Sequence, residues 1–158
     1  MITEVDRYHG VALRLIIAGS EKPIVIGKCD TYGRLNSYSL DKRIAIYLKH
    51  STKRLAPWAF SFTVDHLKEL VELRARYASV WIILICGLDG VVGISLAEFA
   101  SITASRPGGV ASLRVDRAPR TMYRVFGNES PLQFAKPNGV SALLSELSAT
   151  FDYENAAP

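Results

Sequence analysis

Positively charged side chains that can bind phosphate are concentrated in one short part of the sequence. Five of them fall within thirteen residues: Lys42, Arg43, Lys49, Lys53 and Arg54. Aromatic rings, which can stack on nucleotide bases, lie among them at Tyr47 and Trp58. Contacts from lysine and arginine to phosphate position a protein on nucleic acid. The spacing therefore predicts a surface for an anionic ligand, with DNA or RNA as the leading partner.

A second group of cations lies in the C-terminal third of the chain. Its members are Arg106, Arg114, Arg117, Arg120 and Arg124, and the one acid among them is Asp116. Arg117 and Arg120 flank the pair Ala118-Pro119, which indicates a turn, so we expect both to be exposed. The alternative is that these are solvated arginines of an antiparallel hairpin. The two interpretations differ in whether both groups of cations form one surface.

The first half of the chain contains clear signals for the elements that carry these residues. Thr3 can cap a helix that Gly19 ends. Residues 36–40 and 43–51 predict two strands, and the polar pair Asp41-Lys42 between them predicts a hairpin. Residues 58–63 predict another strand, with large side chains on one face.

The second half begins with the clearest helix, which Thr63 caps and which carries arginines in its last turn. Residues 79–86 are a continuous apolar run, the pattern of a strand at the centre of a sheet, and residues 91–96 predict its antiparallel neighbour. We then expect a short helix, three further strands ending with PLQFAK, and a terminal helix over 139–147.

Length and composition predict one globular domain over residues 1–150 and a disordered tail over 151–158. The 158 residues are 49% hydrophobic and carry a net charge of +4. The two cysteines lack metal or redox spacing and the first residues do not form a secretory signal, so we expect a cytoplasmic protein. The longest apolar run has seven residues, too short to cross a membrane.

The order of elements predicts an α+β fold, or α/β, in which helices flank a single mixed central β-sheet and a β-rich extension follows at the C-terminus. The region from Glu4 to Leu96 resembles the core of the restriction-endonuclease-like (PD-(D/E)XK) superfamily. The similarity consists of a helix, a three-strand meander, a helix and a strand, with Lys49 late in the third strand.

That resemblance implies a nuclease that uses Mg²⁺. Glu4 and Asp41 would be the metal ligands, and together with Lys49 they would be the catalytic residues. In the third-strand motif Tyr47-Leu48-Lys49, however, tyrosine stands where the family has an acid. Two forms of the hypothesis therefore stay open: a Mg²⁺-dependent nuclease, or a non-cleaving relative that needs no cofactor.

Each of these residues also has a purely structural interpretation. Lys49 can lie at the surface with its stem over Tyr47 or Trp58. Glu4 can stabilise the start of its own helix, and Asp41 can form the turn. The three histidines lack metal-ligand spacing, and no serine lies in a GxSxG motif.

Three functions remain open from the sequence. The first is a nuclease-like domain that binds nucleic acid through Lys42, Arg43, Lys53, Arg54, Arg117 and Arg120. The second is a protein-interaction domain without enzymatic activity, a homodimer whose exposed strand faces carry Trp58, Tyr123 and Phe126. The third is a domain that binds an acidic small molecule at the basic hairpin.

Overall fold

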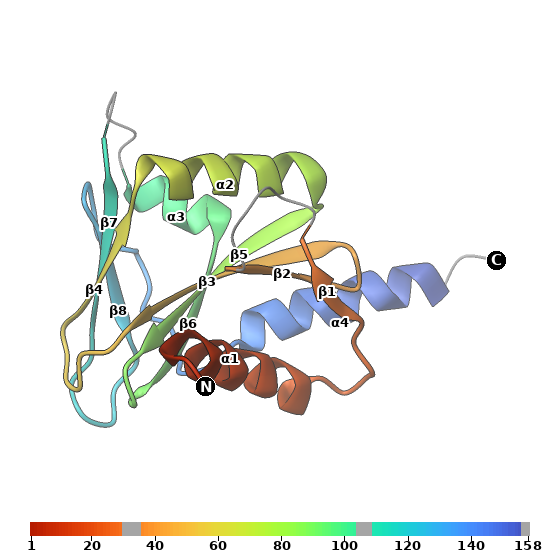
Figure 1. Cartoon of the computed structure of the whole chain (residues 1–158), viewed down its shortest axis with the longest axis horizontal. Helices are drawn as coiled ribbons and strands as arrows, with labels where there is room; N and C mark the ends of the chain where they lie inside the picture. Colours follow the sequence, from red (N-terminus) through yellow and green to blue (C-terminus); the bar gives the residue numbers. More distant parts are fainter. Residues whose placement is uncertain (30–35, 104–108, 156–158) are drawn as a thin grey trace.

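A central five-stranded sheet organises the protein. The computed structural model describes residues 1–29, 36–103 and 109–155. The strand order is β1-β2-β3-β5-β6 (Figure 1). β1 (Ile26–Lys28), β2 (Ser37–Leu40) and β3 (Ile44–Ser51) form an antiparallel meander. β5 (Ser79–Cys86) runs parallel to β3, and β6 (Gly90–Ser95) returns antiparallel to β5.

Three other strands form a second, antiparallel sheet in the order β4-β7-β8. They are β4 (Trp58–Phe62), β7 (Ala111–Asp116) and β8 (Arg124–Gly127). The predicted α+β class is confirmed, but the strands are divided between two sheets rather than placed in one. β5 occupies the position beside β3, so β4 pairs with β7 instead.

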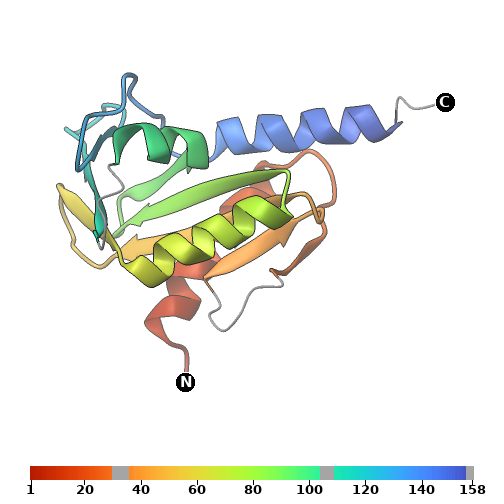
Figure 2. The ribbon, with the colours of Figure 1, turned by 90° about the horizontal axis from the view of Figure 1, so that it is seen from above.

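Four helices cover the central sheet within the described residues, two on each face (Figures 1 and 2). α1 (Glu4–Gly19) and α4 (Ser141–Asn155) lie on one face. α2 (Val64–Arg76) and α3 (Leu96–Ile102) lie on the other, beside the second sheet. The sequence predicted the starts of α1 and α2 because threonine hydroxyls accept the free N–H groups there.

The alternation of side chains along β3 assigns its residues to two hydrophobic cores. Ile44, Ile46 and Leu48 pack with α1 and α4. Ala45 and Tyr47 pack with α2, α3 and the second sheet. Because neighbouring residues of a strand point to opposite faces, Lys49 and His50 emerge on different sides of the sheet.

The C-terminal part differs from the sequence prediction in two ways. α4 continues to Asn155, so residues 151–155, which we assigned to a disordered tail, belong to a helix. The predicted strand PLQFAK is absent from the described residues as a regular strand; it makes isolated bridges through Pro131 and Lys136 only. Residues 156–158 lie outside the described part. None of the described helices is both long and apolar enough to cross a membrane.

Candidate nucleic-acid interface

The structure does not bring Glu4, Asp41 and Lys49 together. Glu4 lies beside His50, with 2.9 Å between Oε1 and Nε2, on the α1 side of the sheet. Asp41 lies in the turn before β3, where its Oδ1 accepts a hydrogen bond from the Val25 N–H at 2.8 Å. His50 is six residues beyond Ile44, so the length of β3, about 20 Å at roughly 3.3 Å per residue, separates the two carboxylates.

Lys49 lies on the opposite side of the sheet from Glu4, at the start of α2. Its Nζ is 3.4 Å from Nδ1 of His66 and 5.2 Å from the centre of the Phe62 ring. Burial lowers the pKa of Lys49, and the negative charge of Glu69 opposes this shift. The Lys49 ammonium therefore lies near the Phe62 ring and His66, and within the described residues no hydrogen bond or ion pair joins it to a carboxylate.

These positions do not fit a bound Mg²⁺. Hard cations require several oxygen ligands within about 2.6 Å, which Glu4 and Asp41 cannot supply from opposite ends of β3. In the described part of the chain, no three His, Cys, Asp or Glu side chains form a group that could hold a metal ion. Asp41 instead acts as the turn former that its position suggested, with a backbone φ of 50°.

Two basic loops from distant parts of the sequence do come together. The loop between β3 and β4 contributes Arg54, Leu55 and Ala56, and the loop between β7 and β8 contributes Arg117, Ala118, Pro119 and Arg120. They enclose a pocket of about 410 Å³ that Trp58 and Asp89 complete. We call this the basic pocket. Of the two predicted groups of cations, Arg54 from the first and Arg117 and Arg120 from the second meet at this pocket, which Lys49 does not line.

The other predicted cations lie elsewhere or are engaged. Lys42 and Arg43 are at the opposite end of β3, in or beside the turn that contains Asp41. Lys53 belongs to the same loop as Arg54, but its Nζ donates a hydrogen bond to the Pro57 carbonyl at 2.9 Å. Arg106 lies outside the described residues.

Buried aromatic rings hold the two loops in place. Trp58 Nε1 donates a hydrogen bond to the Lys53 carbonyl at 2.8 Å, which fixes the first loop. The Trp58 ring contacts Tyr123 edge to face, with 6.1 Å between ring centres. Trp58 is 2% exposed and Tyr123 is fully buried. The expectation that these two rings lie on exposed strand faces is therefore wrong: they form the core beneath the pocket.

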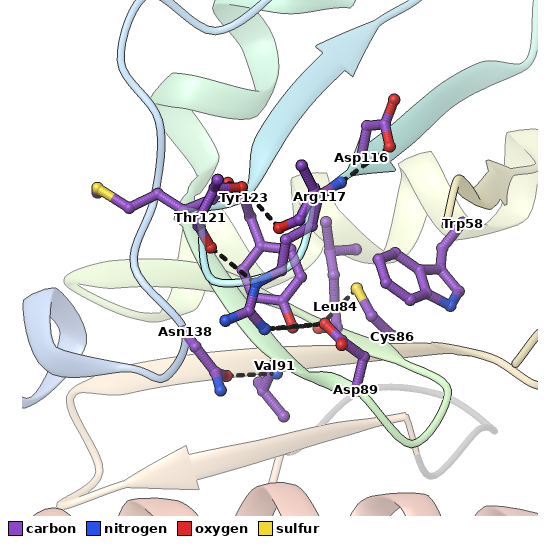
Figure 3. Close-up of polar contacts among 12 residues, drawn as sticks. Trp58, Leu84, Cys86, Asp89, Val91, Asp116, Arg117, Thr121, Tyr123 and Asn138 are labelled. Atoms are coloured by element: carbon purple, nitrogen blue, oxygen red, sulfur yellow. Dashed lines mark hydrogen bonds and ion pairs between the residues drawn. The ribbon is translucent and has the colours of Figure 1, made fainter. Parts of the chain in front are cut away.

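Arg117, Asp89 and Tyr123 form a polar clamp between the β5–β6 turn and the β7–β8 loop (Figure 3). Arg117 Nη1 donates hydrogen bonds to Asp89 Oδ2 at 2.9 Å and to the Tyr123 hydroxyl at 3.1 Å. Arg117 Nε donates to the Thr121 carbonyl at 2.7 Å. The Tyr123 hydroxyl in turn donates to Asp89. Arg117 is thus engaged on three sides by its own protein.

The clamp changes the protonation of its members. Burial favours a raised pKa for Asp89, but hydrogen bonds from Tyr123 and Arg117 and the Arg117 charge outweigh it and lower the pKa. Burial, together with the bond to Asp89, raises the pKa of Tyr123. Asp89 is therefore charged and Tyr123 neutral near pH 7. A side chain at Gly90 would collide with the clamp, since an added Cβ would lie 2.5 Å from the Tyr123 hydroxyl.

Arg54 and Arg120 remain available for a ligand. Both are exposed, and neither has an ion pair or hydrogen bond with another residue of the described segments. Arg120 has a backbone φ of 64°, so it lies in the tight part of its loop. Three arginines and one acid, Asp89, line the pocket, which leaves a local excess of positive charge.

The sequence interpretation missed Asp89 and the role of Tyr123. The sequence predicted residues 79–86 and 91–96 as antiparallel neighbours, and the run Gly87-Leu88-Asp89-Gly90 forms the turn between these two strands. An acid in that turn was a signal, but its partner follows it by 28 residues and cannot be assigned from spacing. Comparison of the chain with known protein families, curated proteins and solved structures gave no match.

Proposed function

We propose that this protein binds nucleic acid at the basic pocket and does not cleave it. The observation that carries the proposal is that Arg54 and Arg120, from loops far apart in the sequence, line one pocket with Arg117. Arginines that only keep the surface solvated do not need to line a common pocket. A concave site with an excess of guanidinium groups attracts phosphate, which is the repeating charge of DNA and RNA.

The proposal includes a nuclease-like origin for the core. It is supported by the order of the elements, since the antiparallel β1-β2-β3 meander is followed by α2 and by β5 parallel to β3. Cleavage has no such support. The carboxylates at Glu4 and Asp41 lie apart, and Lys49 faces His66 rather than either of them.

Titration of labelled oligonucleotides, followed by fluorescence anisotropy, tests the proposal. We expect binding that weakens steeply between about 50 and 200 mM salt, because bound phosphates release counterions. Arg54→Ala and Arg120→Asn should each weaken binding to every sequence and lower the salt dependence by about one phosphate contact. Asparagine is chosen for Arg120 because it tolerates a positive φ.

Arg14→Ala is the matched control. Arg14 is an exposed arginine on α1, away from the pocket, so its loss removes the same charge from another surface. If Arg14→Ala and Arg54→Ala weaken binding equally, the pocket is not the site. If no oligonucleotide binds at low salt, the proposed function is wrong. Mg²⁺-dependent cleavage by the purified protein would contradict the non-cleaving form.

The homodimer alternative has weaker support. Of the three aromatic side chains on which it depended, Trp58 and Tyr123 are buried within one chain, and Phe126 alone lies on an outer strand face. Light scattering separates the two hypotheses. A dimeric mass together with no oligonucleotide binding would favour the alternative.

A further inference from the structure

The outer face of the second sheet carries a group of side chains that the basic pocket does not include. Along β7 and β8, alternate residues point away from the core, and these include Arg114, Arg124 and Phe126. In Figure 1 the second sheet forms the left edge of the molecule, with α2 and α3 to its right. We call Arg114, Arg124 and Phe126 the outer platform.

The platform combines an aromatic ring with two cations. The Arg114 guanidinium lies 4.3 Å from the centre of the Phe126 ring, and the Arg124 guanidinium lies 5.5 Å from it. Both arginines are exposed, and Phe126 is half-buried. The neighbouring outward positions hold the small residues Ala59, Ser61 and Ser112, so no large side chain stands over the ring from β4.

The charge of this face is positive. Asp116 is the one acid among the outward residues of the three strands, and its contact with Arg114 is long, 4.0 Å between Nη1 and Oδ2. That contact leaves both groups about half exposed, with side-chain exposures of 53% and 46%. An exposed pair of this kind contributes little, so a phosphate can displace it.

The platform and the basic pocket belong to the same hairpin. Arg124 pairs with Asp116, and Arg117 follows Asp116 into the loop that forms the pocket wall. A flexible strand of nucleotides can therefore place phosphates at the pocket and unpaired bases on Phe126 and the guanidinium planes. A duplex keeps its bases stacked inside and cannot use the ring.

We propose that the outer platform makes this protein selective for single-stranded nucleic acid over duplex. The inference rests on the proposed function, because the same hairpin must first bind phosphate. It adds a stacking site and a substrate class that the pocket alone does not define.

The test compares three labelled probes in the anisotropy assay: an oligodeoxyuridylate, an oligouridylate and a DNA duplex, each about 12 nucleotides or base pairs long. We expect both single strands to bind more tightly than the duplex. Phe126→Leu should lower single-strand affinity at least about fivefold and leave duplex affinity unchanged, because it removes one stacking ring. Phe126→Tyr keeps a ring and should retain the native preference. A difference between the two single-stranded probes identifies DNA or RNA as the source.

The outcomes separate the two proposals. Equal affinity for single strands and duplex, or an unchanged affinity in Phe126→Leu, overturns the platform but leaves the pocket if Arg54→Ala still weakens binding. Absence of binding by any probe overturns both. Circular dichroism of each variant shows whether it folds. The double variant Arg114→Gln, Arg124→Gln provides a second test of the platform that keeps the Phe126 ring in place.

Discussion

Replacement of Asp89 by asparagine should have opposite effects on stability and on binding. The side chain keeps its shape but loses its charge, so the ion pair with Arg117 disappears and the bonds in the clamp weaken. Unfolding experiments should therefore show a less stable protein. The binding assay should show tighter binding of oligonucleotides, because Arg117 is released and a carboxylate leaves the pocket.

The loss of stability follows from the surroundings of the carboxylate. Hydrogen bonds to a charged group contribute about 1.5 to 3 kcal/mol, and Asp89 accepts two from side chains. The side chains of Arg117 and Asp89 are 21% and 35% exposed, so water screens part of the attraction. We expect Asp89→Asn to lower the free energy of unfolding by about 1 to 2 kcal/mol in urea titrations.

The pH dependence has a definite sign. Because folding lowers the pKa of Asp89 from its ordinary value of 3.8, the charged carboxylate stabilises the native state above that value. The stabilisation is lost as the pH falls through the lowered pKa. The difference in unfolding free energy between the native protein and Asp89→Asn should therefore be constant near pH 7 and shrink below 3.8.

Controls separate the clamp from general effects of charge. Glu72→Gln removes one exposed negative charge from α2 and should leave stability and affinity nearly unchanged. Tyr123→Phe removes the hydroxyl that makes two hydrogen bonds of the clamp, with Asp89 and with Arg117, and should destabilise the protein. Tyr8→Phe, by contrast, removes a hydroxyl with no hydrogen bond to another described residue. If Asp89→Asn lowers both stability and affinity, Asp89 does not compete for Arg117, and the reasoning fails.

Two further predictions concern the packing of the fold. Gly127→Ala should destabilise the protein by about 2 kcal/mol or more, because an added Cβ would lie 1.9 Å from the Ile102 carbonyl oxygen. Gly10→Ala, on an open helix surface, should instead stabilise the protein by about 0.5 to 1 kcal/mol, and thermal unfolding compares the two variants. A thiol reagent at pH 8 should modify Cys29, which is half-buried, and should spare Cys86, because burial raises the pKa of the Cys86 thiol to about 12. Equal labelling rates of the two cysteines in the folded protein would contradict the buried position of Cys86.

The sequence predicted the elements well where the signal was local. The Thr3 and Thr63 caps, the hairpin at Asp41-Lys42 and the apolar run of β5 each depend on residues within one turn or strand. The pairing of β4 with β7 could not be predicted in this way. Those strands lie some 50 residues apart, and alternation indicates which face is buried but not which strand is the neighbour.

The candidate site was predictable only where its signals were local. Arg54, Arg117 and Arg120 were recognisable as cations, and the structure places them at one pocket. The expectation that Arg117 is exposed was wrong, because its side chain is 21% exposed and bonds to Asp89 and Tyr123. The prediction that Glu4 and Asp41 bind a metal ion was wrong because the resemblance assigned them by the order of the elements. Their separation depends instead on the length of β3, since the two carboxylates lie at opposite ends of this strand. His50 and Lys49 are neighbours in sequence yet lie on opposite sides of the sheet.

The partner of each cation determines its role in this protein. A net charge of +4 describes the whole chain, but Arg117 contributes little to an external field because Asp89 neutralises it at 2.9 Å. Arg54 and Arg120 have no such partner in the described residues. The clamp thus fixes the loop through one arginine, and the other two, held by that loop and its neighbour, keep their charge for a ligand.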